Sequence, residues 1–525
     1  MMRILVLPFL LIAGGLHAQF DSTVYKLAQT IQASTMHDHV FTLASPEYEG
    51  RETGTEGIRK AAVYLANQIK ADGINPVPGD TNYFQEVSFS SIKWSNLSLN
   101  VSGVAMEHMR DYVVNPQLFP ITPETLDITS LLFLGYGIDD PLYSDYNGVD
   151  VKGKNIVIYN REPQASDGRY TITGTNKASA WTEDVTKKIN LARDKGVASL
   201  WIIDNQFKDR LTKYKRAVMG GENLMGDPKD LLMNQIPVFF ISLTQDERIL
   251  GQKFRKIQKL KYKIDQTGKP YKATIQGDFH WSGTHEIKTT HGANVMAYIE
   301  GMDPVMKQEV VVLSAHYDHL GKRGEDIYFG ADDNASGTSA VLEIAQAMAI
   351  AKANGTGPKR SVLCILMTGE EKGLLGSQYY SEHPVFPLAN TVANVNIDMI
   401  GRLDAKHKEG NYTYVIGSDR LSTALHQVNE TANQTYTHLQ LDYTYNADDD
   451  PNRFYYRSDH YNFAKNGIPA IFFFSGVHED YHRPTDTPDK IMFDKAVTIA
   501  QLAFYTTWEL ANREERIKVD VVGRN

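Results

Sequence analysis

The chain has 525 residues, enough for two to four domains of about 100 to 200 residues each. With 42% hydrophobic residues and a formal net charge of -9, it is not a disordered, collagen-like or nucleic-acid-coating protein. The single cysteine, Cys364, excludes an intramolecular disulfide and a cysteine-based zinc site, so a bound metal would need oxygen and imidazole ligands.

The first residues have the layout of a secretory signal peptide. Arg3 precedes an apolar run from Ile4 to Leu16, and Ala18 stands before Gln19. The run is shorter than the roughly 20 apolar residues that a membrane-spanning helix needs, so we predict cleavage after Ala18. No later stretch is long and apolar enough to span a bilayer. We therefore expect a mature protein without stable membrane insertion, in the periplasm or secreted to the medium.

The pattern along the chain changes twice. Residues 25–32 and 58–73 are predicted helices, because apolar residues recur there at three- and four-residue spacing. The middle segment has short β-rich runs at 133–138, 153–160, 198–204 and 236–242, with one clear helix at 187–196. From residue 294 on, helices such as 336–353 alternate with strands that are apolar at nearly every position.

Such strands, joined by helices, predict an α/β fold with a mostly parallel central sheet flanked by helices. The β-rich middle segment is then a domain inserted into the α/β domain. We predict a signal peptide at 1–18, the N-terminal part of the catalytic domain at 19–117, the insertion at 118–279 and the main part of the catalytic domain at 280–525.

Histidines and carboxylates follow the ends of four predicted strands and occupy one loop. They are His316, Asp318 and His319; Asp332 and Asp333 in the loop; Glu370 and Glu371; Asp398; and His478 to His482 with Asp486. A lone carboxylate after a strand is usually a helix cap, and a lone histidine is usually a satisfied polar group. Independent surface acids have no reason to recur at successive strand ends, where ligand sites of open α/β sheets lie. The set suits zinc, and one carboxylate can bridge two ions.

One local match is set aside. His478 to His482 fits the HExxH pattern, which binds zinc only on a helix that places both histidines on one face. The segment follows Gly476 at a strand end and reaches Pro484 two residues after His482, so a helix would be broken almost at once.

Five motifs carry a family resemblance: AHYDHLG, GADDNASG, TGEEKGLLGS, NIDMIGR and DYHRPTDT. In this order they resemble the MH-clan zinc exopeptidases, which include secreted dizinc aminopeptidases and glutamate carboxypeptidase. The segment EGRETGTEG, residues 49–57, resembles the opening segment of that family, and residues 118–275 resemble its inserted protease-associated domain. The resemblance implies a phosphorylase/hydrolase-like fold, two zinc ions per chain and peptide substrates.

The resemblance also implies a role for each metal ligand. His316 and Asp398 would bind one zinc ion, and Glu371 and His482 would bind the other. Asp333 would bridge both ions, whereas its neighbour Asp332 would not.

The resemblance further implies three catalytic side chains. Glu370 would be the general base, Asp318 would hold the imidazole of His316, and the Tyr481 hydroxyl would hydrogen-bond the oxyanion. A carboxylate that is not spent on the metal can take a proton from the activated water and pass it to the leaving amine. The sequence alone does not say which of Glu370 and Glu371 faces the metal.

Several alternatives stay open. Glutaminyl cyclisation with one zinc and carboxypeptidase activity use the same scaffold, and a receptor-like protein would have a dead site. The complete ligand set favours a dizinc aminopeptidase, although amino versus carboxy polarity rests on the resemblance alone. Arg402 is expected to orient Asp398, to meet substrate or to lie on the surface. Asp459 and His460 either line the site or pair with each other.

Overall fold

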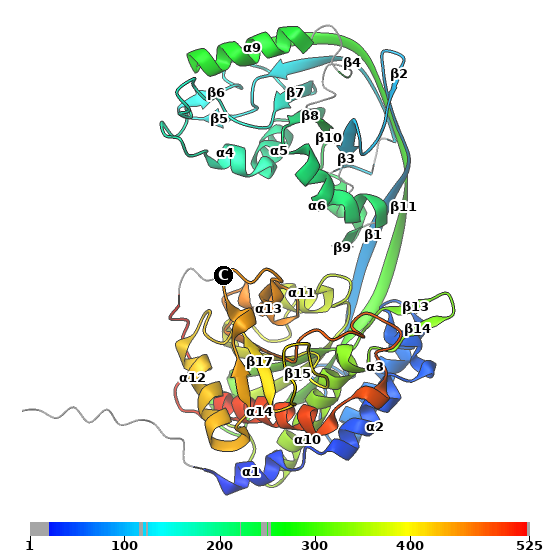
Figure 1. The fold of residues 1–525 in the computed structure, drawn as a ribbon, viewed down its shortest axis with the longest axis vertical. Helices are drawn as coiled ribbons and strands as arrows, with labels where there is room; N and C mark the ends of the chain where they lie inside the picture. The colour runs from blue at the N-terminus through cyan, green and yellow to red at the C-terminus, as the bar shows by residue number, and fades with distance from the viewer. Residues whose placement is uncertain are drawn as a thin grey trace, which may run out of the picture. The chain divides into compact units, whose positions relative to one another are not determined.

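The computed structural model describes residues 20–114, 119–121, 124–220, 222–242, 249 and 254–521. The chain forms two compact units, unit 1 from residues 1–87 and 291–525 and unit 2 from residues 88–290 (Figure 1). The predicted boundaries at 117/118 and 279/280 both lie inside unit 2. The chain passes between the units within two long strands: β1 (Phe84–Val101) begins in unit 1 and continues into unit 2, and β11 (Lys272–Ile299) begins in unit 2 and ends in unit 1. The predicted signal peptide lies outside the described residues.

Unit 1 contains a mostly parallel sheet, as predicted. Its strands lie in the order β18-β17-β19-β16-β12-β15-β11. Their bounds, besides β11, are β12 (Val310–His316), β15 (Ser361–Met367), β16 (Thr391–Ile397), β17 (Tyr412–Ile416), β18 (Gln440–Asp442) and β19 (Ala470–Phe474). The central pairs β12 with β15, β12 with β16, and β16 with β19 are parallel, and β11 and β17 pair antiparallel with their neighbours β15 and β19.

Helices cover both faces of this sheet. Alternate residues of β12 belong to different clusters: Val311 and Leu313 pack in one core and Val310 and Val312 in another. The first core is formed with α1 (Ser22–Ala28), α2 (Ala33–Leu43), α3 (Glu56–Ala71), α10 (Gly337–Ala353), α12 (Thr423–Ala432) and α14 (Phe493–Asn512). The second includes residues of α11 (Leu375–Glu382) and α13 (His460–Ala464). Burial on both faces explains why these strands are apolar at nearly every position.

Unit 2 also contains parallel strands. β4 (Thr125–Leu134), β7 (Asn155–Tyr159), β8 (Ser199–Asp204) and β10 (Val238–Ser242) pair parallel, with part of β11 at one edge and β3 (Tyr112–Val114) at the other. The predicted strand at 133–138 is wrong beyond Leu134, because Gly135 and Gly137 have positive φ angles of 50° and 65° and form a turn.

The prediction of a single clear helix in the middle segment is also wrong. Besides α5 (Val185–Asp194), unit 2 contains α4 (Ala180–Glu183), α6 (Phe207–Gly220), α7 (Pro228–Leu232) and α9 (Phe254–Thr267). α9 buries Ile257 and Ile264 in the core, and its apolar residues at 254, 257, 260 and 264 recur at helical spacing, a signal that the prediction missed. Across the described part of the chain, no helix combines the length and apolar character required to cross a membrane.

Candidate metal centre and active site

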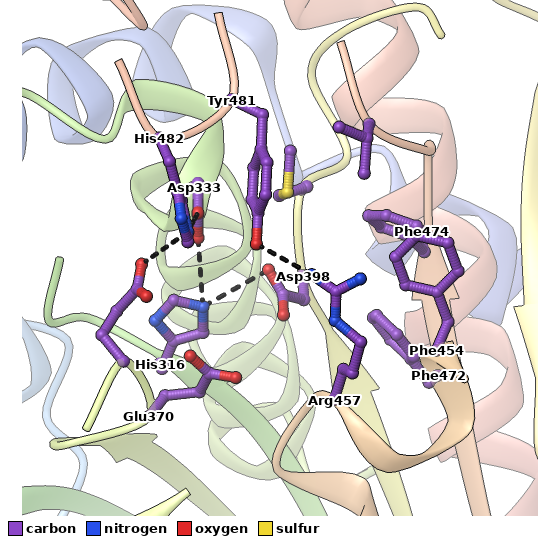
Figure 2. A pocket seen from close by; sticks show the side chains of 13 residues that line it. His316, Asp333, Glu370, Asp398, Phe454, Arg457, Phe472, Phe474, Tyr481 and His482 are labelled. Carbon is purple, nitrogen blue, oxygen red and sulfur yellow. Dashed lines mark hydrogen bonds and ion pairs between the residues drawn. The ribbon is translucent and has the colours of Figure 1, made fainter. Parts of the chain in front are cut away.

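The candidate side chains converge at the carboxyl edge of the unit 1 sheet (Figure 2). Each follows a strand or precedes a helix: His316 ends β12, Glu370 and Glu371 follow β15, Asp398 follows β16, Tyr481 and His482 follow β19, and Asp333 lies in the turn before α10. Their shared edge follows from the parallel pairing of β12, β15, β16 and β19. The segment 478–482 is not helical, as expected from Pro484.

Asp333 lies between two histidines. Its Oδ1 is 3.4 Å from His316 Nε2, and its Oδ2 is 3.2 Å from His482 Nε2. His316 Nε2 is also 3.4 Å from Asp398 Oδ1, and His482 Nε2 is 3.4 Å from Glu371 Oε1. The five predicted ligands therefore form two sets that share Asp333 through opposite oxygens, as the dashed lines in Figure 2 show in part.

These separations fit zinc. Ligand atoms about 2.0 to 2.1 Å from a tetrahedral zinc ion lie about 3.3 to 3.4 Å from one another. Within the described residues, the buried oxygens Asp398 Oδ1 and Glu371 Oε1 accept no hydrogen bond of good geometry and face imidazole nitrogens, 3.4 Å and 2.9 Å away, an arrangement typical of atoms that share a metal. Imidazole and carboxylate groups are suitable zinc ligands. The residues present therefore fit a pair of zinc ions that share Asp333.

Two further side chains join the cluster. His319 is fully buried, and its Nδ1 lies 2.9 Å from Glu371 Oε1 and 3.7 Å from Asp333 Oδ2. Ser458 donates a hydrogen bond of 2.7 Å to Asp398 Oδ2. In the sequence, His319 lies in the motif AHYDHLG and Ser458 directly precedes the candidate Asp459, but their spacing gave neither a role.

The two adjacent glutamates have different surroundings. Glu371 faces His482 and Asp333, whereas Glu370 groups with His316 and Asp398, with one ligand atom of each within 4.8 Å of the others. Burial, together with the negative charges of Glu371 and Asp398, raises the pKa of Glu370 well above its ordinary value. A carboxylate with a raised pKa accepts a proton more readily than an ordinary glutamate does.

Tyr481 points into the pocket. Arg457 Nη2 donates to the Tyr481 hydroxyl oxygen over 3.2 Å, so the hydroxyl proton remains available for another acceptor (Figure 2). Burial and the nearby carboxylates of Asp333 and Glu371 raise the pKa of Tyr481, which keeps this proton on the oxygen. Tyr481 is thus a neutral hydrogen-bond donor at the pocket wall.

Asp318 contacts His316 mainly through its backbone. The Asp318 carbonyl oxygen is 3.1 Å from His316 Nδ1, and the nearer carboxylate oxygen is 3.7 Å away. The carboxylate accepts hydrogen bonds from the Thr53 hydroxyl (2.9 Å) and the Glu370 amide (3.1 Å). Asp318 therefore joins His316 to the loop that carries Glu370.

Residues 294–507 match the family model described as peptidase family M28. They belong to peptidase family M28. Aminopeptidase YwaD of Bacillus subtilis (strain 168) is 28% identical over 217 residues, 40% of this chain and 43% of YwaD. A probable leucine aminopeptidase of Arthroderma otae is 31% identical over 220 residues, 41% of this chain and 57% of that protein. The chain thus matches about half the length of these relatives.

Solved structures of aminopeptidases also resemble the chain. The aminopeptidase from Aneurinibacillus sp. strain AM-1 aligns with a TM-score of 0.48 and 18% identity, over 95% of this chain and 98% of that one. A zinc aminopeptidase from Bacillus subtilis aligns with a TM-score of 0.45 and 18% identity, over 94% and 99% of the two chains.

The structure gives different surroundings to the three weaker candidates, Arg402, Asp459 and His460. Arg402 pairs with the buried Asp480 at 3.0 Å and the exposed Glu479 at 3.4 Å, so its partners are acids of the loop after β19 and not Asp398. His460 stacks on Phe472 with ring centroids 4.8 Å apart. Burial raises the pKa of Asp459 to about 7, with the carboxylates of the site adding to the shift.

Two buried groups hold the turn that carries Asp333. The Asp486 carboxylate accepts hydrogen bonds of 3.1 Å from the backbone amides of both Asp332 and Asp333. Asp332 turns its own carboxylate toward His478, whose Nε2 is 3.3 Å away. Asp332 therefore supports the turn from behind, while Asp333 faces His316 and His482.

Proposed function

We propose that the protein is a zinc-dependent aminopeptidase that hydrolyses the N-terminal peptide bond of peptides. The carrying observation is that the two oxygens of Asp333 face separate histidine–carboxylate pairs at spacings that suit zinc ligands. The relatives named as aminopeptidases support the amino-terminal polarity.

In this proposal, His316 and Asp398 would hold one zinc ion, and Glu371 and His482 would hold the other. Asp333 would be a ligand of both ions. Bound zinc supplies Lewis acidity, which polarises the substrate carbonyl and lowers the pKa of water. The ligand roles rest on the geometry above and on the order of the motifs.

The side chains that are free of the metal carry the proton and the charge. Glu370 takes a proton from the attacking water and delivers it to the leaving amine, a task that suits its raised pKa. Tyr481 donates its hydroxyl proton to the carbonyl oxygen as negative charge develops there, and Arg457 holds the tyrosine oxygen in place. Phe454, Phe472 and Phe474 form an apolar wall that favours an apolar residue next to the scissile bond (Figure 2).

A peptide panel tests the proposal. Purified protein is offered peptides with free and with N-acetylated termini, with and without a chelator, and the released residue is identified by mass spectrometry. We expect chelator-sensitive release of N-terminal residues from free peptides only. Release of C-terminal residues from blocked peptides would replace it with a carboxypeptidase, and cyclisation of N-terminal Gln without cleavage would replace it with a glutaminyl cyclase.

Two finer points belong to the same proposal. Unit 2 is a protease-associated domain that restricts the size of substrates, a view supported by its place between the two parts of unit 1 in the sequence. The protein is exported after removal of residues 1–18, which the charge and apolar pattern of that segment support. The intact mass of protein recovered from fractionated cells tests export: a mass that includes residues 1–18 contradicts it.

A further inference from the structure

Three consecutive residues, Arg51, Glu52 and Thr53, contact the loops that carry the candidate ligands. The buried Arg51 guanidinium donates hydrogen bonds of 2.8 Å to three backbone carbonyls, those of Tyr317, Phe329 and Gly330. Glu52 pairs at 2.6 Å with Lys372, which directly follows Glu371. A segment far upstream in the sequence thus contacts the loop after β12, the turn before α10 and the loop after β15.

Thr53 occupies the centre of this arrangement. It is only 4% exposed, and its hydroxyl donates to Asp318 Oδ2 at 2.9 Å and accepts from the Gly369 amide at 3.1 Å, with a longer contact of 3.5 Å to the Thr368 hydroxyl. The direction of each bond is fixed, because the carboxylate can only accept and the amide can only donate. A side chain without a hydroxyl would leave both buried partners unsatisfied.

Through these partners Thr53 reaches both halves of the reaction machinery. Asp318 faces Nδ1 of His316, which leaves Nε2 directed at Asp333 and Asp398. The other oxygen of the Asp318 carboxylate accepts from the Glu370 amide, and Gly369 immediately precedes Glu370. The position of one hydroxyl therefore sets where the His316 ring and the Glu370 loop lie relative to each other.

We propose that Thr53 is a positioning residue of the active site, acting through Asp318 on His316 and through Gly369 on Glu370. The inference rests on the proposed function, which assigns a metal ligand to His316 and the general base to Glu370. Residues that orient metal ligands from outside the ligand set typically change metal affinity or activity about 10- to 100-fold when they are replaced.

The test removes the hydroxyl and then restores it. Thr53→Val keeps the shape of the side chain but has no hydroxyl, whereas Thr53→Ser keeps the hydroxyl and loses the methyl group. Thr53→Ala compared with Thr53→Ser makes the same comparison with smaller side chains, and it decides the question if the valine variant does not fold. Thr55→Val is the matched control, because Thr55 is exposed and its hydroxyl only bonds the Glu52 carbonyl at 2.7 Å.

Two measurements are made on each folded variant: kcat and KM for a peptide substrate, and zinc affinity by competition with a chelating dye. We expect Thr53→Val to lower kcat and zinc affinity about 10- to 100-fold with KM nearly unchanged, and Thr53→Ser and Thr55→Val to stay close to the parent. Parent-like values in Thr53→Val would overturn the proposal, and so would an equal loss in Thr53→Ser. If the parent cleaves no peptide, the proposed function fails, while the dye competition still decides the role of Thr53.

Discussion

Both units place polar side chains at the carboxyl ends of parallel strands, but they balance the charges differently. In unit 2, Asp204 ends β8 and forms an ion pair with Arg210, and it also accepts a hydrogen bond of 2.8 Å from Asn160 at the end of β7. In unit 1, no ion pair with Lys or Arg is found for Asp333 or Asp398 among the described residues; their partners are imidazoles.

The contrast shows what distinguishes a ligand site from a structural network. A buried carboxylate that is not balanced costs several kcal/mol, so a fold retains it only where something else supplies the positive charge. Unit 2 supplies that charge with its own side chain, Arg210. In unit 1 the buried Arg51 donates to backbone carbonyls rather than to Asp333 or Asp398. These two acids face imidazoles, which fits the proposed zinc ions. Polar residues at strand ends are therefore weak evidence for a ligand site by themselves. The absence of a paired Lys or Arg side chain is stronger evidence.

Replacing one acid in each unit gives the sharpest test of this contrast. Asp333→Asn should abolish zinc binding and lower kcat/KM about 10³-fold or more, because metal catalysis contributes several kcal/mol. Asp204→Asn should leave the zinc content and activity of folded protein unchanged, and it should destabilise unit 2 by about 3 to 5 kcal/mol, because Arg210 loses its counter-charge. Zinc content by atomic emission, peptide hydrolysis and denaturant unfolding measure the three quantities. Zinc loss in Asp204→Asn would break the distinction between the units.

The sequence alone predicted more of unit 1 than of unit 2. In unit 1, apolar strands predicted the sheet, and the acids and histidines after successive strands predicted that these side chains gather at one edge, because strand order forces their ends together. Which five of them would bind metal came from the family resemblance and stays a prediction. Thr53 could not be found in this way, since its partner Asp318 is 265 residues away and its contact depends on how α3 and the preceding loop pack. His319 was visible, but only geometry shows that its ring faces Glu371.

In unit 2 the prediction from the sequence was less accurate, for two reasons. Glycines inside an apolar run ended β4 early, because Gly135 and Gly137 adopt a backbone that most residues avoid. The helix α9 was missed although its sequence carries a helical period, because most of its residues are charged or polar and only a narrow stripe is apolar.

The two adjacent glutamates should respond differently, and this separates ligand from base inside unit 1. Glu370→Gln should lower kcat about 10²- to 10⁴-fold with zinc content unchanged, the range for loss of a general base. Glu371→Gln should lower zinc affinity as well, because its Oε1 faces His482. Titration with a chelating dye and steady-state kinetics distinguish the two. Equal zinc loss in both variants would mean that Glu370 is a ligand, and the roles would have to be reassigned.

The pocket wall should show a smaller effect. Tyr481→Phe removes the proton donor and should lower kcat about 10²-fold, as expected for one oxyanion donor, with KM and zinc content close to the parent. Tyr445→Phe is a suitable control, since that ring packs among Tyr414 and Phe454. A Tyr481→Phe variant with parent-like kcat would leave the oxyanion to other groups.

The smallest expected effect is on the pH dependence of stability, and it concerns Lys188, a buried lysine of unit 2. Its ammonium group faces the backbone carbonyls of Tyr159 and Arg161. Burial lowers the pKa of Lys188 to about 7, so between pH 7 and 9 the unfolded chain holds this proton and the folded chain does not. Stability of unit 2 should therefore rise with pH in that window, by up to about 1.4 kcal/mol per pH unit. The raised pKa of Asp145, about 6, acts in the opposite direction but below this window.

Lys188→Met should remove that slope, and Lys208→Met, at an exposed position, should keep it. Tryptophan fluorescence during denaturant unfolding follows unit 2, because four of the five tryptophans, Trp94, Trp181, Trp201 and Trp281, lie within residues 88–290. The same slope in Lys188→Met and in the parent would show that the lysine keeps its proton in the folded state. Unit 2 would then contain a buried lysine whose positive charge is balanced by the acids around it. That outcome would sharpen the contrast with Asp333 and Asp398 of unit 1, for which the described part of the chain shows no paired lysine or arginine.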